Sequence, residues 1–404
     1  MIAGKHILLG ISGGIAAYKI PELIRSLIKS GAEVRVTTTR HALEFVTELT
    51  LQTVSGAPVY SDVFAAINEH STEHISLPDW ADMMVIAPAT ANVLGKMASG
   101  IADDALTTTI CSCVARKTMV IVPAMNDKMW ENPAVQQAIN TIRTWDNISV
   151  LEPDEGFLAC GTTGKGRMPE IKVIQEAIEY ALSPKTLTGK RVLITAGATQ
   201  ERIDPVRFLS NYSTGKMGIA LAQECARRGA NVTLVCGAVS LPVFNPFGTI
   251  ERIDALSAQT MHDVCVEKWK DNDIAILCAA VADFTPSTEA TEKIKKQPGQ
   301  TEANLVLRTT PDIARALGES KRADQQIIGF ALETQNEISN AEEKLAKKKL
   351  DYIILNSLRD EGAGFGVDTN RVTIISSDGT KTPLPLLSKQ EVAFKILDFV
   401  GSRS

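Results

Sequence analysis

Short apolar runs alternate with segments of helical periodicity along the chain, and this alternation constrains the fold more than any other feature. An apolar run at residues 6–12 ends in Gly13 and Gly14, and apolar residues from Ile20 to Ile28 then recur at the three- and four-residue spacing of one helix face. Residues 33–39 alternate as a second strand. This order of strand, glycine turn, helix and strand is typical of parallel βαβ units, so we predict an α/β protein.

The second half of the chain opens in the same way. We predict a strand at 191–195, a turn at Gly197, a helix at 219–228 and a strand at 231–236. Residues 180–190 contain Pro and Gly and show no periodicity, which is typical of a linker. The sequence therefore predicts two Rossmann-like doubly wound domains, at 1–183 and 191–404, joined by a linker at 184–190. Further strands are predicted at 82–87, 117–122, 147–151, 273–280, 326–331, 351–355, 371–376 and 381–384, and further helices at 258–270 and 338–349.

Charge and hydropathy exclude several classes of partner. Lys and Arg number 42 against 47 Asp and Glu, a formal net charge of −5 without long runs of like charge, so a nucleic-acid or anionic-membrane partner is not expected. The longest apolar run, 274–282, is about half of the ~20 residues that cross a bilayer. The seven cysteines form no CxxC pair, and no signal-peptide pattern opens the chain, so we expect a cytoplasmic protein without a disulfide or zinc framework.

The glycine-rich turn Gly10-Ile11-Ser12-Gly13-Gly14 lies between the first predicted strand and helix. Backbone N–H groups and a helix start at such a place can hold a phosphate. The turn does not match GxGxxG, so a mononucleotide-type phosphate fits it better than a dinucleotide. A plain tight turn is the alternative reading when the motif is taken alone.

Polar residues also follow the next two predicted strands of this half. Thr90 and Asn92 lie in Ala-Pro-Ala-Thr-Ala-Asn, and Asn126 lies in Pro-Ala-Met-Asn, where a turn former is the alternative. His74, in Glu-His-Ile-Ser-Leu, taken alone reads as a surface histidine. Cys160 stands in a basic, glycine-rich segment, whereas packed cysteines prefer apolar elements, and this context favours chemistry.

Together these motifs resemble the flavin-containing cysteine decarboxylases, and most closely phosphopantothenoylcysteine decarboxylase, over about residues 3–180. The resemblance implies a flavodoxin-like fold that binds FMN. The FMN-binding residues that it implies are Ser12, Gly13, Gly14, Thr39, Ala89, Thr90 and Asn92. By the same resemblance His74 is the base-like catalytic residue, Asn126 holds the substrate carboxylate, and Cys160 is the proton donor.

These roles agree with the chemistry of decarboxylation. The electrons released with CO₂ need an acceptor that no side chain supplies, so a cofactor is required. Imidazole titrates near neutral pH and suits proton handling, and a neutral amide can bind a carboxylate without an ion pair that would oppose its loss.

In the second half, the segment Ser-Asn-Tyr-Ser-Thr-Gly-Lys-Met-Gly, residues 210–218, lies at a predicted helix start. It fails as a Walker P-loop, because Ser210 replaces a glycine and Met217 replaces the magnesium-binding hydroxyl. The cluster can cap the helix or cradle an anion. Asp283 ends a buried strand, and Lys293, Lys344 and Lys348 supply cations that, taken singly, read as solvated lysines. One acid and three basic groups near strand ends suit a nucleoside triphosphate with Mg²⁺.

The second half as a whole resembles phosphopantothenate-cysteine ligase over about residues 190–395. The resemblance rests on residues 196–218 together with AAVADF, KIKK, PDIA, GFALET and the lysines of residues 344–348. It implies a carboxylate activated by CTP, with Asn211 on the acyl-cytidylate and Lys293 stabilising phosphate charge. The CTP-binding residues that it implies are Asp283, Lys293, Pro311, Asp312, Ile313, Ala314, Phe330, Lys344 and Lys348, with Mg²⁺ bound mainly by nucleotide phosphates near Asp283.

The order of the halves resembles the bacterial bifunctional decarboxylase/ligases of coenzyme A synthesis. We therefore expect CTP-driven coupling of 4′-phosphopantothenate to cysteine, followed by FMN-dependent decarboxylation to 4′-phosphopantetheine. The family resemblance also implies a homo-oligomer with trimer-type decarboxylase contacts and dimer-type ligase contacts, which together could build a dodecamer. The rivals are a decarboxylase of peptide C-terminal cysteines, which leaves the ligase-like half unexplained, and a flavoprotein binding module with a degenerate site.

Overall fold

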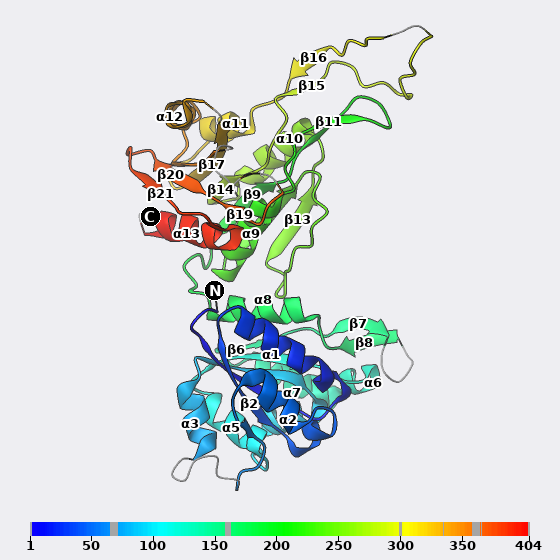
Figure 1. The fold of residues 1–404 in the computed structure, drawn as a ribbon, viewed down its shortest axis with the longest axis vertical. Helices are drawn as coiled ribbons and strands as arrows, with labels where there is room; N and C mark the ends of the chain where they lie inside the picture. Colours follow the sequence, from blue (N-terminus) through cyan, green and yellow to red (C-terminus); the bar gives the residue numbers. More distant parts are fainter. Residues whose placement is uncertain are drawn as a thin grey trace. The chain divides into compact units, whose positions relative to one another are not determined.

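The computed structural model describes residues 2–64, 72–157, 163–298, 301–333, 335–357, 364 and 366–402. The chain divides into two compact units, the first formed by Met1–Ser183 with Phe244–Phe247 and the second by Pro184–Val243 with Gly248–Ser404. Each unit is an α/β domain built on one large, mostly parallel sheet (Figure 1). Among the described residues, no helix is both long enough and apolar enough to cross a membrane.

The sheet of the first unit has the order β3-β2-β1-β4-β5-β6, and all of its strands are parallel. Without the two-residue edge strand β3 this is the 2-1-3-4-5 order of flavodoxin-like folds, whose ligand site lies where the strand order reverses. That switch point falls between β1 and β4. The strands are β1 (His6–Ile11), β2 (Glu33–Thr38), β3 (Val59–Tyr60), β4 (Met83–Ala89), β5 (Thr118–Pro123) and β6 (Ile148–Val150), and a hairpin pairs β7 (Asp154–Phe157) with β8 (Thr163–Arg167).

Both faces of this sheet are covered, which explains the unbroken apolar run of β1. Ile7, Leu9 and Ile11 belong to one core with α1 and α8, whereas Leu8 belongs to the other core with α4, α5 and α7. The helices are α1 (Ile20–Lys29), α2 (Glu48–Ser55), α3 (Glu73–Trp80), α4 (Ala91–Ser99), α5 (Ala105–Cys113), α6 (Asp127–Trp130), α7 (Pro133–Arg143) and α8 (Ile171–Leu182), with short 3₁₀ helices at Ile15–Lys19 and Arg40–Glu44.

The second unit has a sheet of order β13-β12-β9-β14-β17-β18-β20-β21, in which only β20 and β21 run antiparallel to their neighbours. Its parallel part has the Rossmann order 3-2-1-4-5-6, so its switch point lies between β9 and β14. The strands are β9 (Arg191–Ala196), β12 (Asn231–Cys236), β13 (Ile250–Asp254), β14 (Ile274–Leu277), β17 (Gln326–Glu333), β18 (Tyr352–Ser357), β20 (Val372–Ser376) and β21 (Lys381–Pro383).

Helices cover both faces of this sheet as well. Val192 and Ile194 pack with α9 and α13, and Leu193, between them, packs with α10, α11 and α12. The helices are α9 (Lys216–Arg227), α10 (Ala258–Trp269), α11 (Ile313–Glu319), α12 (Glu337–Lys347) and α13 (Lys389–Gly401). The predicted strand 231–236 is confirmed to the residue, and the predicted helix 219–228 begins three residues earlier, after Gly215.

The predicted strand 273–280 is too long, because β14 ends at Leu277. The chain leaves the ladder there: the Thr195 hydroxyl accepts a hydrogen bond from the Ala279 amide at 3.1 Å, and Ala280 forms an isolated bridge with Ala198. The apolar run therefore supplies both a buried strand and the loop that follows it at the switch point.

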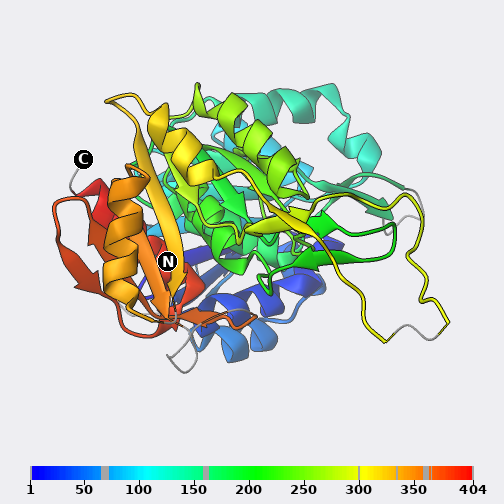
Figure 2. The same ribbon diagram turned by 90° about the horizontal axis from the view of Figure 1, so that it is seen from above.

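Two antiparallel pairs extend from the second unit. They are β10 (Gln200–Arg202) with β11 (Phe208–Ser210), and β15 (Phe284–Pro286) with β16 (Leu307–Thr309), and a further short pair joins β19 (Thr369–Asn370) to β22 (Leu387–Ser388). Between β15 and β16 the described residues 287–298 and 301–306 run far out from the sheet (yellow in Figures 1 and 2). We call this segment the arm.

Candidate functional sites

In the first unit, the loops after β1 and β4 are joined across the switch point by one hydroxyl. Ser12 Oγ donates to the Pro88 carbonyl at 2.7 Å and accepts from the Thr90 amide at 3.0 Å, and the Ser12 side chain is fully buried. Because its only proton is used on Pro88, the hydroxyl shapes the loop rather than donating to a ligand. Backbone amides of the glycine turn remain as the donors that can face a phosphate.

The glycines of this turn are required by close packing. A Cβ on Gly13 would lie 2.6 Å from Cβ of His41, and one on Gly14 would lie 3.2 Å from the Thr90 methyl group. Backbone can therefore approach a ligand here, as the sequence predicted, and the two sides of the switch point are held close together.

The end of β2, the strand paired with β1, carries three buried hydroxyls. Thr37, Thr38 and Thr39 are all buried, and within the described part of the chain their Oγ1 atoms have no hydrogen-bond partner. Burying a hydroxyl without a partner costs free energy, so groups of this kind at a switch point suit a polar ligand. These orphan hydroxyls, which include the predicted FMN-binding residue Thr39, and the glycine turn fit a bound FMN.

Asn126 begins α6 directly after β5. Its Oδ1 accepts from the Lys128 amide at 2.9 Å, so the turn-forming role of this residue is present. The adjoining Met125 amide donates to the Gly166 carbonyl at 2.9 Å, which ties the β7–β8 hairpin to the Asn126 loop. A Cβ on Gly164 would lie 2.7 Å from Asp127 Cβ, and one on Gly166 would overlap the Met125 carbonyl oxygen, so this approach requires glycine.

Of the other two predicted decarboxylase residues, the structure describes only His74. Cys160 lies outside the described residues, in the connection between β7 and β8. His74 is half-buried at the start of α3, and its carbonyl accepts from Ser112 Oγ on α5 at 2.6 Å. Among the described residues no hydrogen bond joins His74 to the loops after β1, β4 or β5. Thr90 precedes α4 as its N-cap, Ala89 is buried at the end of β4, and Asn92 is exposed on the first turn of that helix.

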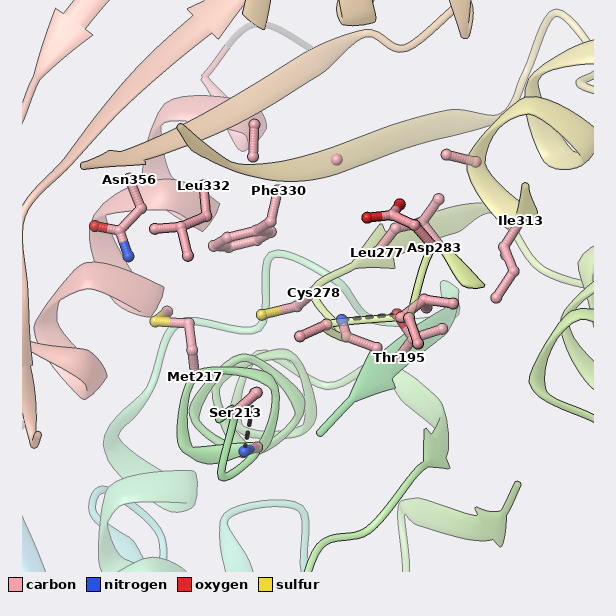
Figure 3. Close-up of a pocket in the computed structure, with 18 of the residues that line it drawn as sticks. Thr195, Ser213, Met217, Leu277, Cys278, Asp283, Ile313, Phe330, Leu332 and Asn356 are labelled. Carbon is pink, nitrogen blue, oxygen red and sulfur yellow. Dashed lines mark hydrogen bonds between the residues drawn. The ribbon is translucent and has the colours of Figure 1, made fainter. Parts of the chain in front are cut away.

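In the second unit, a cavity of about 560 Å³ opens at the switch point between β9 and β14. We call it the switch-point pocket. It brings together most of the residues predicted to bind the nucleotide: Asp283, Pro311, Asp312, Ile313, Ala314, Phe330, Lys344 and Lys348. Figure 3 shows the Asp283 carboxylate, the Phe330 ring and the Ile313 side chain around the same hollow. These residues come from four separate segments, which only the fold unites.

Lys344 of α12 and Lys348, the residue after that helix, reach this pocket already paired. Lys344 Nζ lies 2.5 Å from Glu333 Oε1, and Lys348 Nζ lies 3.0 Å from Asp312 Oδ2. Asp312 also caps α11, because its Oδ1 accepts from the Arg315 amide at 3.1 Å. The pairing keeps both ammonium groups ordered at the pocket edge, where an anionic ligand can replace the carboxylates as their ion-pair partner.

Other lining residues were not predicted. Met217 and Cys278 direct their sulfur atoms into the pocket (Figure 3), and burial raises the pKa of the Cys278 thiol to about 12, so it stays neutral. Lys216 donates to the Asp368 carboxylate at 2.6 Å and to the Gly366 carbonyl at 2.8 Å. Lys389 is buried and donates to the Val367 carbonyl, and desolvation lowers its pKa. Gly215-Lys216 was visible in the sequence as a rejected P-loop, whereas nothing marked Lys389.

Two predicted ligase residues, Asn211 and Lys293, are not part of the pocket lining. Asn211 Nδ2 donates to the carbonyls of Ala280 at 3.1 Å and Val281 at 3.3 Å, both of which line the pocket, so it fixes the loop after β14. Lys293 lies exposed on the arm. In the described residues no group of three His, Cys, Asp or Glu side chains is placed to hold a metal ion.

Comparison with known protein families gives one match for each half of the chain. The family model Flavoprotein matches residues 1–183, and the model DNA/pantothenate metabolism flavoprotein C-terminal domain matches residues 187–403. The chain is 46% identical to the Coenzyme A biosynthesis bifunctional protein CoaBC of Bacillus subtilis (strain 168) over 407 residues, covering 100% of this chain and 98% of that protein.

A second relative carries a different name. The chain is 47% identical over 357 residues to a Cysteine/Cysteine sulfinic acid decarboxylase from an unknown prokaryotic organism, covering 87% of this chain and 98% of that protein. Among solved structures, the crystal structure of the C-terminal domain of Coenzyme A biosynthesis bifunctional protein CoaBC aligns with 54% of this chain and 97% of its own, at 39% identity and a TM-score of 0.45.

Proposed function

The chain belongs to the family of bifunctional coenzyme A biosynthesis proteins, and from this premise we propose how its residues divide the two reactions. The protein is an enzyme of coenzyme A biosynthesis that ligates 4′-phosphopantothenate with cysteine and decarboxylates the resulting phosphopantothenoylcysteine to 4′-phosphopantetheine. We assign decarboxylation to the first unit and ligation to the second.

CTP is the cosubstrate that we propose for the ligation. A free carboxylate is not attacked by an amine at neutral pH, so the carboxylate of phosphopantothenate first attacks the α-phosphorus of CTP and pyrophosphate leaves. The cysteine amine then attacks the acyl-cytidylate carbonyl, and CMP departs as the leaving group. The observation that carries this assignment is the switch-point pocket, which gathers Asp283, Phe330, Lys344 and Lys348 at one strand-end opening.

The residues around this pocket have distinct tasks in the proposal. Lys344 and Lys348 bind the nucleotide through charge, and Asp283 lies where Mg²⁺ carried by the phosphates would be held. Asn211, which is bonded to the loop after β14, contacts the acyl-cytidylate. Lys293 reaches this intermediate from the arm and stabilises charge on the phosphate.

FMN is the cofactor that we propose for the decarboxylation. It would accept two electrons from the substrate thiol group and return them to the decarboxylated product, so that the overall reaction is redox-neutral. The amides of Gly13 and Gly14 and the Thr39 hydroxyl bind its phosphate side, while Ala89, Thr90 and Asn92 line the ring. Asn126 holds the substrate carboxylate as a neutral donor, His74 handles the proton, and Cys160 returns a proton to the product. The orphan hydroxyls at the end of β2 support this assignment.

Homo-oligomerisation is part of the proposal because parts of each site lie apart in one chain. Exposed apolar side chains cluster on the short strand pairs of the second unit, which supports a dimer contact there; they are Val206, Phe208, Tyr212, Phe284 and Val306. Phe64 and Ile75 are exposed apolar side chains of the first unit, which supports a trimer-type contact there. The cytoplasm is the proposed location, and the free state of the six described cysteines supports it.

Decarboxylation of free cysteine or cysteine sulfinic acid is the second candidate, because a 47% identical relative carries that name. Mass spectrometry of the products distinguishes the two. With 4′-phosphopantothenate, cysteine, Mg²⁺ and CTP we expect 4′-phosphopantetheine, CMP and pyrophosphate, and with ATP in place of CTP a much lower yield. Release of CO₂ from cysteine alone, with no phosphopantothenoylcysteine formed from the complete mixture, would favour the second candidate.

A further inference from the structure

The arm that carries Lys293 depends on its attachments for its position. Residues 291–298 are all exposed and form neither helix nor strand. A segment of this kind has few packing contacts to hold it, so its backbone hydrogen bonds to the rest of the unit decide where Lys293 lies.

The main attachment is the carboxylate of Asp204, in the turn between β10 and β11. The Asp204 side chain has 0% of its surface exposed. Its Oδ1 accepts from the Val206 and Arg207 amides, both at 2.9 Å, and its Oδ2 accepts from Arg207 Nε at 3.0 Å. Oδ2 also accepts from the backbone amide of Ile294 at 3.2 Å, and this last bond crosses to the arm.

The same ion pair also binds the carbonyl group of Ile294. Arg207 Nη2 donates to the Ile294 carbonyl at 2.8 Å while it is paired with Asp204, so one carboxylate and one guanidinium hold both polar backbone groups of a single residue. The Ala290 amide adds a third bond, to the Ile203 carbonyl at 3.0 Å. The amide held by Asp204 belongs to the Lys293–Ile294 peptide bond, so the backbone next to Lys293 is fixed.

We propose that Asp204 is the positioning residue of the ligase reaction, holding the arm through Ile294 so that Lys293 is presented to the reacting phosphate. This inference rests on the proposed function, in which Lys293 acts in ligation. Asp204 itself does not touch substrate; it acts through Arg207 and Ile294. The Arg207 guanidinium and the surrounding amides hold the pKa of Asp204 well below its usual range, so the carboxylate stays ionised throughout the pH range of an enzyme assay.

The test is a double-mutant cycle in the full-length enzyme with Asp204→Asn and Lys293→Gln. An asparagine keeps the shape of the side chain but cannot accept from Ile294, Arg207 and the turn amides together. We expect Asp204→Asn to lower the CTP-dependent ligation rate on the order of 10- to 100-fold, since small misplacements of a positioned group have effects of this size. In the Lys293→Gln background the same change should lower the residual rate by less than about threefold, because the effects of coupled residues do not add.

Limited trypsin digestion gives a readout that does not depend on activity. We expect trypsin to cleave the Lys293–Ile294 bond only when Ile294 is released from Asp204 and Arg207. The Lys296–Gln297 bond lies further along the arm and serves as an internal reference. We expect Asp204→Asn to increase cleavage at Lys293 relative to cleavage at Lys296 about tenfold. Decarboxylation of supplied phosphopantothenoylcysteine should stay unchanged, which verifies the fold of the first unit.

Two further variants complete the design. Glu289→Gln removes an acid from the same arm whose single ion pair within the described part of the chain is with Arg202, at 3.6 Å near the surface. Both readouts should therefore stay at the wild-type value. Arg207→Lys keeps the charge beside Asp204 but loses the forked donors, and it replaces Asp204→Asn in the cycle if that variant fails to fold. We expect a smaller loss of ligation rate, which is again non-additive with Lys293→Gln.

The outcomes separate the two proposals. Additive effects of the two substitutions, or unchanged cleavage at Lys293 in Asp204→Asn, would overturn the positioning role. Full ligase activity of Lys293→Gln would instead refute the role of Lys293 in the proposed function, and with it the catalytic purpose of the Asp204 contact.

Discussion

The Ser12 hydroxyl accepts a hydrogen bond from the Thr90 amide at 3.0 Å, so that a residue after β1 holds the loop after β4 across the switch point of the first sheet. The second sheet repeats this arrangement with different residues, since the Thr195 hydroxyl of β9 accepts from the Ala279 amide after β14 at 3.1 Å. In both units a buried hydroxyl stabilises the opening where a ligand of a doubly wound sheet is bound.

Ser12→Ala is therefore expected to loosen the proposed FMN site. The substitution leaves the Thr90 amide and the Pro88 carbonyl without their partner in a buried place, which costs about 1–3 kcal/mol of unfolding free energy. We expect a lower melting temperature and faster loss of FMN in gel filtration. Thr37→Val is the control, because its buried hydroxyl has no partner in the described part of the chain, and its apoprotein should be no less stable than the wild type. Equal melting temperatures of Ser12→Ala and the wild type would contradict this account.

Gly166→Ala should impair decarboxylation selectively. The new methyl group would overlap the Met125 carbonyl and push the β7–β8 hairpin away from the Asn126 loop. We expect kcat for phosphopantothenoylcysteine to fall about 10- to 100-fold, with ligation unchanged. Gly156→Ala, on the paired strand, meets only the flexible Arg167 side chain at 3.4 Å and should stay within about twofold of the wild type. A decarboxylation rate equally low in both variants would argue against a specific contact at Met125.

Lys344→Gln and Lys348→Gln are expected to weaken nucleotide binding. Both ammonium groups line the switch-point pocket, and a charge-assisted contact contributes about 1.5–3 kcal/mol, so KM for CTP should rise about tenfold or more. The increase should shrink at high salt, because the lysines are partly exposed and their attraction is screened. Lys347→Gln removes a charge from the same helix outside this pocket and should leave KM for CTP unchanged. The measurement is steady-state kinetics at two salt concentrations. An increase in KM for CTP in Lys347→Gln as well would point to a general effect of charge and contradict a specific contact with Lys344 and Lys348.

Cys278 should resist alkylation. Burial raises its thiol pKa to about 12, and only the thiolate reacts, so its reactive fraction at pH 8 is on the order of a thousandfold below that of an ordinary cysteine. We expect iodoacetamide to modify the exposed Cys111 before Cys278, and the rate at Cys278 to rise with pH up to about 12. Peptide mass mapping with and without CTP measures both sites. Protection by CTP at Cys278 but not at Cys111 is expected, and similar rates at the two residues would contradict a buried, pocket-facing thiol.

Much of the fold was predictable because its signals are local. The strand at 231–236 and the helix that follows Gly14 obey periodicity and turn chemistry within a few residues, and the structure confirms both. The short strands β10, β11, β15 and β16 have three residues each and were missed, because such lengths carry no period. The end of β14 at Leu277 was also missed, since an apolar run reads alike in a strand and in a buried loop.

In the two candidate sites, too, some residues can be predicted from local sequence and others only from the tertiary structure. The sequence by itself determined the two α/β units, and most of the residues that it predicts for nucleotide binding line one pocket, since glycine turns, strand ends and family motifs are read along the chain. Only the tertiary structure decided that Lys389 and Cys278 face the same pocket as Asp283, that the Ser12 proton is used on Pro88, and that Asp204 holds the arm at Ile294. The physical reason is that these contacts join segments far apart in the chain, and the order in which the strands pack, not any local pattern, sets which segments meet.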